Sequence, residues 1–96
     1  MANLRVVKKD IDYLVNEVIE DCYISLYFNQ ASKAEIVTIM EEAVALRNTL
    51  FVKVNNPAEK HNKHLVKKHF KQVRQELVEG VNTLFEKLSS VCKATK

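Results

Sequence analysis

A chain of 96 residues, of which 47% are hydrophobic, is long enough for one modest core and too short for two. The composition excludes an intrinsically disordered chain, and a single glycine with a single proline argues against a β-sheet and its tight turns. A net charge of +3 requires no acidic partner, and two cysteines are too few for a disulfide scaffold. We therefore expect one α-helical domain over residues 1–96.

The first predicted helix covers about residues 3–28, where apolar residues recur with the 3.6-residue period of an α-helix. Its predicted core stripe is Leu4, Val7, Ile11, Leu14, Val18, Cys22 and Leu26. Tyr13, Tyr23 and Tyr27 fall on the opposite side, and the helix ends in CYISLYF, which is apolar almost all round. Because such a surface is usually covered and tyrosine is favoured at interfaces, we expect these tyrosines to form a homodimer interface. The alternatives are coverage by the end of the third helix, or a groove for another protein's helix.

The second predicted helix covers about residues 33–54, between the capping signal SKAE and the stop signal VNNP. Its predicted core stripe is Ile36, Met40, Ala43, Val44, Arg47, Leu50, Phe51 and Val54. Arg47 interrupts this stripe, and a buried arginine requires a partner. We expect a buried ion pair between Arg47 and Glu17, with Asp21 or Glu76 as alternative partners. A polar ligand pocket around Arg47 is the competing interpretation.

The third predicted helix begins at residue 57 or 62 and continues to about residue 92. Its predicted core stripe is Val66, Phe70, Val73, Leu77, Val81, Leu84, Leu88 and Val91. Gly80 lies inside this helix and indicates a close helix contact or a slight bend. Short connections make successive helices antiparallel, so the sequence predicts an all-α, up-down-up three-helix bundle with the third helix extended. We expect the end of that helix, TLFEKLSSVC, to cap the bundle or to pack on another subunit.

Residues 60–74, KHNKHLVKKHFKQVR, contain six Lys and Arg residues, three histidines and no acidic residue. One flank of the helix carries Lys60, Lys63, Lys67, Lys71 and Arg74. Asp10, Glu17 and Asp21 form an acidic flank on the first helix, which would face the basic flank if the two helices are parallel. The first interpretation is therefore a set of ion pairs that align the helices. The alternative is non-specific binding of nucleic acid or another polyanion, although Phe70 points toward the core and cannot stack on bases.

The sequence contains no pattern typical of a catalytic or metal site. His61 and His64 can share a helix face, but a stable metal site requires three or four ligands. There is no phosphate-binding glycine loop, nucleophile elbow or metalloprotease motif. Cys22 lies on the core stripe and Cys92 has no neighbouring base, so we interpret both as small hydrophobic residues. We expect no enzymatic activity, no cofactor and no metal.

The sequence also lacks the apolar runs of a signal peptide or a membrane span, so we expect a cytoplasmic protein with reduced thiols and no membrane association. RNTLFVKVNNP at residues 47–57 and VRQELVEGVNTLFEKLSSVC at residues 73–92 resemble small uncharacterised helical proteins of Bacteroidetes bacteria. This resemblance implies a bacterial cytoplasmic setting and no particular activity. Our first functional hypothesis is a non-enzymatic protein that self-associates or binds another protein, and the alternative is nucleic-acid or polyanion binding.

Overall fold

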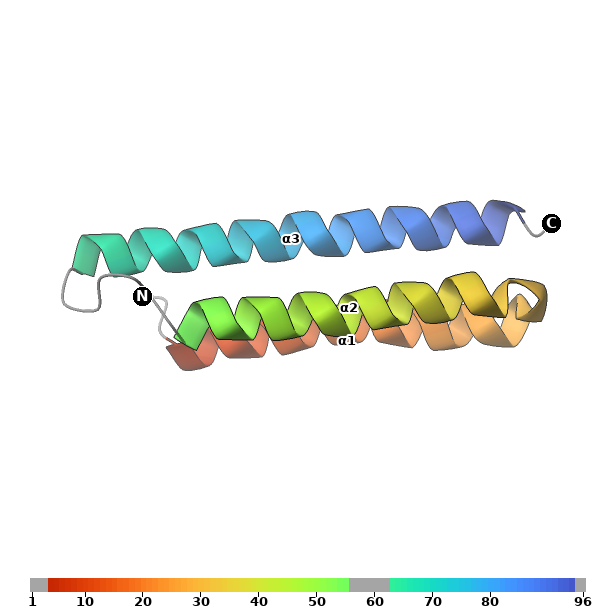
Figure 1. Cartoon of the computed structure of the whole chain (residues 1–96), viewed down its shortest axis with the longest axis horizontal. Coiled ribbons are helices and arrows are strands. Elements are labelled where there is room, and N and C mark those ends of the chain that lie inside the picture. Colours follow the sequence, from red (N-terminus) through yellow and green to blue (C-terminus); the bar gives the residue numbers. More distant parts are fainter. Residues whose placement is uncertain (1–3, 56–62, 95–96) are drawn as a thin grey trace.

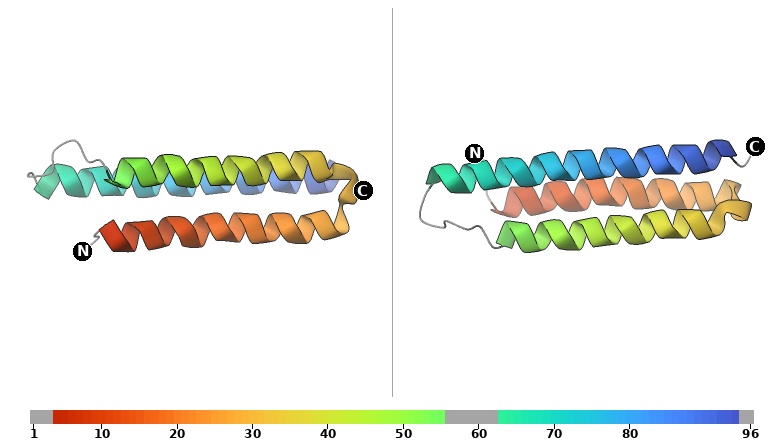
Figure 2. Two further views of the ribbon diagram at one scale, coloured as in Figure 1. Left: turned by 60° about the horizontal axis from the view of Figure 1, so that its bottom comes forward. Right: turned by 45° about the horizontal axis from the view of Figure 1, so that its top comes forward.

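The computed structural model describes residues 4–55 and 63–94, and over these ranges the protein is an all-α bundle of three long helices, as the sequence predicts. The elements in order are α1 (Leu4–Phe28), a single 3-10 turn η1 (Gln30–Ser32), α2 (Lys33–Asn55) and α3 (Lys63–Ala94). The three helices lie side by side in an elongated molecule of 53 × 19 × 17 Å (Figures 1 and 2).

The connection between α1 and α2 is a tight turn held by local hydrogen bonds. The backbone N–H and the side-chain amide of Asn29 both donate to the carbonyl oxygen of Ser25, at 2.8 and 3.1 Å. The N–H of Ser32 then donates to the carbonyl oxygen of Asn29 at 3.0 Å, and Ser32 is buried directly before α2 begins. These bonds satisfy polar groups at the end of α1 and reverse the chain direction within a few residues.

Ion pairs between the helices show how they are aligned. Asp10 of α1 accepts a hydrogen bond from Arg74 of α3 at 2.6 Å, and Ser25 lies against Cys92 of α3. Because these contacts advance together along both helices, α1 and α3 are parallel. Lys53 with Glu76 and Glu42 with Lys87, each pair at 2.9 Å, show that α2 runs antiparallel to α3. The topology is therefore up-down-up.

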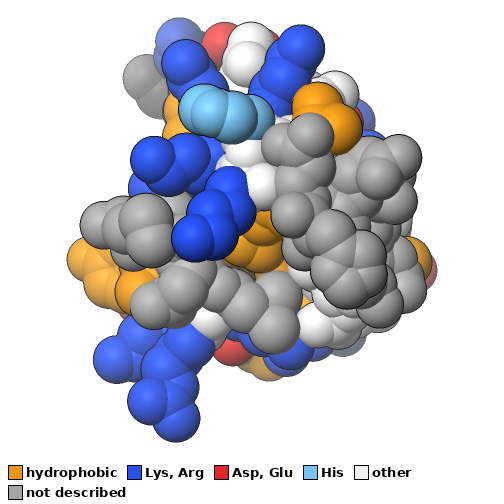
Figure 3. Space-filling view, turned by 90° about the vertical axis from the view of Figure 1, so that its left-hand side faces the viewer, with side chains coloured by type: hydrophobic (Ala, Val, Ile, Leu, Met, Phe, Trp, Pro, Cys, Tyr) orange, Lys and Arg blue, Asp and Glu red, His pale blue; other side chains and the backbone are white. Residues whose placement is uncertain are grey.

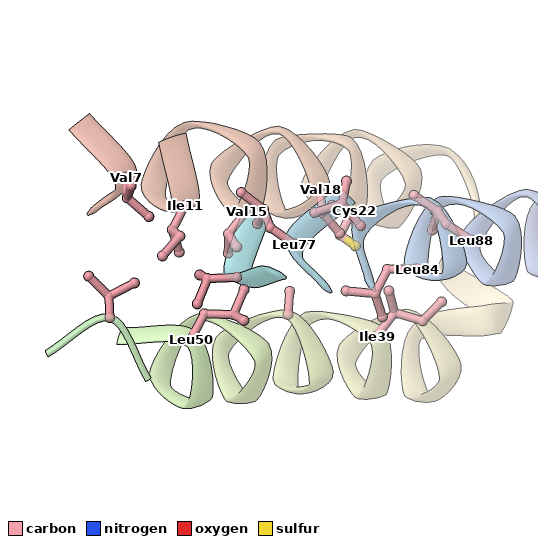
Figure 4. Packing of buried hydrophobic residues seen from close by; sticks show 14 of the residues in the cluster. Val7, Ile11, Val15, Val18, Cys22, Ile39, Leu50, Leu77, Leu84 and Leu88 are labelled. Carbon is pink, nitrogen blue, oxygen red and sulfur yellow. The ribbon is translucent and has the colours of Figure 1, made fainter. Parts of the chain in front are cut away.

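The core fills the space between the three helices, and side chains from all of them point toward one another there (Figure 4). The predicted stripe of α3 is confirmed over its central part, where six of its residues are buried: Phe70, Val73, Leu77, Val81, Leu84 and Leu88. Val66 and Val91, at its two ends, are partly buried. Removal of this apolar surface from water is the main favourable contribution to folding.

The buried faces of α1 and α2 differ in part from their predicted stripes. Val15 and Ile39 are buried although neither belongs to a predicted stripe, and Val44 is 46% exposed although it does. Each helix of a three-helix bundle packs against two others, so its buried face is wider than one narrow stripe. The side chain of Leu4 lies outside the described part of the structure.

Gly80 marks a close contact between α3 and α2, as its position in the sequence predicts. A Cβ atom added at Gly80 would lie 2.8 and 3.0 Å from the two terminal carbons of Leu46. Leu46 is partly buried and packs against the core cluster. The missing side chain therefore lets Leu46 approach the α3 backbone, at the expense of the lower helix propensity of glycine.

The extra length of α3 lies at its beginning, which extends past the start of α1 and the end of α2 (Figures 1 and 2). The other end of α3 packs along α1, where Leu88 is buried and Cys92 touches Ser25 and Asn29. The residues up to Ala94 therefore lie along the side of the bundle and do not cap its end, whereas the alternative that this segment packs on another subunit stays a prediction. Residues 56–62, where the helix could have started earlier, are outside the described ranges.

Candidate functional site

The outer face of α1 carries most of the large apolar side chains that the fold leaves exposed. Ten such residues lie in the described ranges, and six belong to α1: Val6, Tyr13, Tyr23, Ile24, Tyr27 and Phe28. The three tyrosines are 62–77% exposed, which confirms that they point away from the core. Val6, Ile24 and Phe28 were not among the predicted interface residues. The nearly all-apolar segment CYISLYF was the sequence signal that could have identified Ile24 and Phe28.

The end of α1 forms the most apolar part of this face. The rings of Tyr27 and Phe28 meet edge to face, with their centroids 5.2 Å apart, and Phe28 is 75% exposed. Edge-to-face contact is a favourable geometry for two aromatic rings, but it covers little of either side chain. The described residues of α3 leave both rings exposed, so the alternative in which the end of the third helix covers this surface is wrong for these residues.

Two shallow depressions follow the groove between α1 and α3, beside the outer face. One, of about 240 Å³, is lined mainly by Tyr13, Leu14, Leu77 and Val78 and is crossed by the ion pair of Asp10 with Arg74. The other, of about 320 Å³, is lined by residues near the opposite ends of the same helices: Asp21, Ile24, Ser25, Phe85, Leu88, Ser89 and Cys92. Apolar side chains therefore continue from the outer face of α1 onto the neighbouring side of α3.

The basic flank of α3 divides into one paired and several unpaired residues. Arg74 binds Asp10, so the predicted contact between the basic flank of the third helix and the acidic flank of the first is confirmed at this position. Lys63, Lys67 and Lys71 are exposed, and none takes part in the ion pairs of residues 4–55 and 63–94. Lys60 lies outside the described residues.

The end of the bundle where α3 begins is basic, because Lys63, Lys67, Lys68 and Lys71 of α3 are exposed there, near the start of α1 and the end of α2. Figure 3 views this end and shows Lys and Arg side chains over much of its described surface. His69 of α3 contacts the carbonyl oxygen of Lys53 at the end of α2, which ties the two helices together there. Phe70 is buried, as predicted, so its ring is not available to stack on a base.

Arg47 pairs with Asp12 and not with Glu17, so that prediction is wrong. The Nε of Arg47 donates to the Oδ1 of Asp12 at 2.8 Å, and its guanidinium lies 4.1 Å from the ring centre of Phe51. Asp12 is on the side of α1 that faces α2, whereas Glu17 shares the flank of Asp10, which faces α3. The side chain of Arg47 is 38% exposed, so the pair is a surface contact and not a buried one.

The two cysteines are free thiols in different surroundings. Cys22 is completely buried in the core, and burial raises the pKa of its thiol from 9.0 to about 11, with smaller contributions from Asp21 and Cys92. Since a nucleophilic cysteine requires a lowered pKa and access to solvent, Cys22 has neither property. Cys92 is partly buried between Ser25 and Asn29. The interpretation of Cys22 as a small hydrophobic residue is supported by this environment.

The raised pKa of Cys22 predicts a loss of stability in alkali. A group whose pKa is higher in the folded state stabilises the fold fully below its unfolded pKa, and this contribution disappears as the pH rises from about 9 toward 11. At pH 10 we expect a loss of about 1 kcal/mol in the free energy of unfolding from this group. Urea unfolding of the wild type and of Cys22→Ala at pH 8 and pH 10 measures it, because the variant lacks the titrating thiol. An equal loss in both proteins would contradict the assignment.

The structure places no metal-binding cluster among the residues it describes. No group of three or more His, Cys, Asp or Glu side chains in these residues could hold a metal ion, and His61 is not among them. A depression of about 500 Å³ between α2 and α3 is open and contains the exposed ion pair of Glu42 with Lys87. None of the described helices is both long and apolar enough to span a bilayer.

Comparisons with protein-family models, curated protein sequences and solved structures found no match to this chain. The resemblance to small helical proteins of Bacteroidetes therefore stays a prediction.

Proposed function

We propose that this protein is a non-enzymatic helical bundle that acts by binding protein through the outer face of α1, in the first place by self-association. The observation that carries this proposal is the concentration of six exposed large apolar side chains on a single helix. Exposed apolar surface of this kind marks interaction sites, and Tyr and Phe are enriched at protein interfaces. Covering these side chains would remove apolar area from water at about 25 cal/mol per Å².

We propose the cytoplasm as the setting for this activity. Both cysteines are free thiols in the structure, and the cytoplasm keeps thiols reduced.

The tyrosines themselves allow a direct test, because the chain has three tyrosines and no tryptophan, and all three tyrosines lie on the outer face of α1. Acrylamide quenching of the tyrosine fluorescence lifetime therefore reports on this face alone. We expect the quenching constant to fall as the concentration rises from about 2 to about 300 µM, the range of weak dimers. The urea-unfolded chain at the same concentrations is the control. Constant quenching together with a monomeric mass throughout would overturn the proposal.

Polyanion binding is the second candidate function, favoured by the exposed lysines near the beginning of α3. Lys63, Lys67, Lys68 and Lys71 form no ion pair within the described part of the chain, so they are available to phosphates. Binding to a random DNA duplex, titrated at two salt concentrations, tests this candidate. The affinity should fall steeply with salt and depend little on sequence. No salt-sensitive binding would remove the candidate.

A further inference from the structure

A second regular row of side chains runs along α1, opposite the row that enters the core. Its members are spaced alternately three and four residues apart, and all are exposed: Val6, Lys9, Tyr13, Asn16, Glu20, Tyr23 and Tyr27. We call this row the outer seam. A mean spacing of 3.5 residues is the heptad pattern by which one helix packs along another. The buried residues Val7, Ile11, Val18 and Cys22 lie about half a turn away, so α1 has two opposite packing faces.

The outer seam is complementary to itself when two copies of α1 run antiparallel. In the register in which facing residue numbers add up to 29, six of the seven seam residues meet a suitable partner within the described part of the chain, and Tyr27 lies beyond the last pair. The facing pairs are Val6 with Tyr23, Lys9 with Glu20, and Tyr13 with Asn16. Parallel pairing would place Lys9 against Lys9 and Glu20 against Glu20, which is repulsive. The dipoles of the two helices also favour the antiparallel arrangement.

The charges of the seam are free to make this contact. Lys9 and Glu20 are both exposed, and neither belongs to an ion pair within residues 4–55 and 63–94. By contrast, Asp10 and Asp12, on the two flanks of α1, are engaged by Arg74 and Arg47 of the same chain. The fold therefore engages Asp10 and Asp12 internally, whereas Lys9 and Glu20 of the outer seam remain available to an external partner.

We propose that the outer seam of α1 binds a second copy of this chain in an antiparallel, two-fold symmetric dimer, with Lys9 of each copy against Glu20 of the other. This inference rests on the proposed function and specifies its partner and geometry. A two-fold axis places the same patch on both copies, so each favourable pair occurs twice. Tyr13 also lines the depression that contains Val78, so α3 of each copy borders the contact.

A membrane surface fits the outer seam less well than a second copy does. A helix that lies on a bilayer needs a continuous apolar face with basic residues along its opposite, polar face. The outer seam instead alternates apolar residues with Lys9, Asn16 and Glu20, and the opposite face of α1 forms the core of the bundle. This mixture of apolar and oppositely charged positions is typical of helix pairing in water.

Charge reversal tests the geometry, with sedimentation equilibrium as the measurement. Lys9→Glu turns both Lys9–Glu20 pairs of the dimer from attractive to repulsive, and Glu20→Lys does the same. We expect the dissociation constant of the dimer to be about tenfold higher in each variant than in the wild type. The effect is no larger because exposed ion pairs are individually weak. The double variant Lys9→Glu/Glu20→Lys restores opposite charges, and the dissociation constant of its dimer should lie within about threefold of the wild-type value. An equimolar mixture of the two single variants should form a mixed dimer.

The controls separate this inference from the proposed function. Lys68→Glu has the same effect on net charge as Lys9→Glu but lies on α3 at an exposed position, and it should dimerise like the wild type. Circular dichroism confirms that each variant is folded, and all three positions are exposed. A wild-type dimer whose stability is unchanged in both single variants would overturn the antiparallel seam and leave self-association intact. A monomeric wild type with accessible tyrosines would overturn both proposals.

Discussion

Replacing Leu77 by alanine is expected to lower the free energy of unfolding by about 3 kcal/mol. Leu77 is 1% exposed and lies in the middle of α3, where its side chain points into the space between the helices (Figure 4). Truncation removes buried apolar atoms and leaves a cavity that the close-packed neighbours fill only in part. Urea unfolding followed by circular dichroism measures the change.

The matched control for Leu77→Ala is Val78→Ala, one residue further along the same helix. Val78 is 49% exposed, so its truncation should change the stability by about 0.5 kcal/mol or less. Similar losses at the two positions would mean that α3 does not present Leu77 to the core, and the rotational setting of this helix would be wrong.

The second large effect is expected at Gly80, where the side chain of Leu46 of α2 packs against the backbone of α3. Gly80→Val places a branched side chain where even a Cβ would lie 2.8 Å from a terminal carbon of Leu46. Overpacking of this kind forces side chains off their rotamers or moves the helices apart, and we expect a loss of about 2 kcal/mol. The control is Asn82→Val, which introduces the same side chain at an exposed position with little change of helix propensity and should be nearly neutral.

A second substitution at Leu46 tests the cause of the Gly80 effect. Leu46→Ala removes the atoms that a side chain at Gly80 would meet, so the double variant should lose less stability than the two single changes together. Strict additivity would show that the loss at Gly80 arises from the backbone and not from the contact with Leu46.

The sequence predicted the helices and their order because long apolar periods and few turn residues leave little choice of fold. The buried positions of α3 were predicted best, since most of its apolar residues fall on one stripe, from Val66 to Val91. The helices α1 and α2 have apolar residues on more than one side. Whether Val15 and Ile39 are buried depends on how each helix is rotated about its axis relative to the other two. A helical wheel of one helix does not give this rotation.

The ion pairs also show which features the sequence predicts: the relative direction of two helices was predicted correctly, but the exact partner of a charged residue was not. The contact of Arg74 with Asp10 follows from the parallel direction of α1 and α3, which the sequence predicted correctly. The partner of Arg47 required the side of α1 that faces α2, and this is the side of Asp12 and not of Glu17. Among the candidate site residues, the exposure of Tyr13, Tyr23 and Tyr27 followed from helical phase.

The most direct test of the antiparallel α1 dimer is a zero-length carbodiimide cross-link between Lys9 and Glu20. Within one helix these residues are eleven positions and about 16 Å apart, too far for their side chains to form an amide. A mixture of isotopically light and heavy protein identifies cross-links between chains by mass spectrometry. We expect Lys9–Glu20 peptides with one light and one heavy partner. Cross-links between chains that join Lys9 to Asp10 or Asp12 instead, or the absence of any on the outer face of α1, would contradict the dimer.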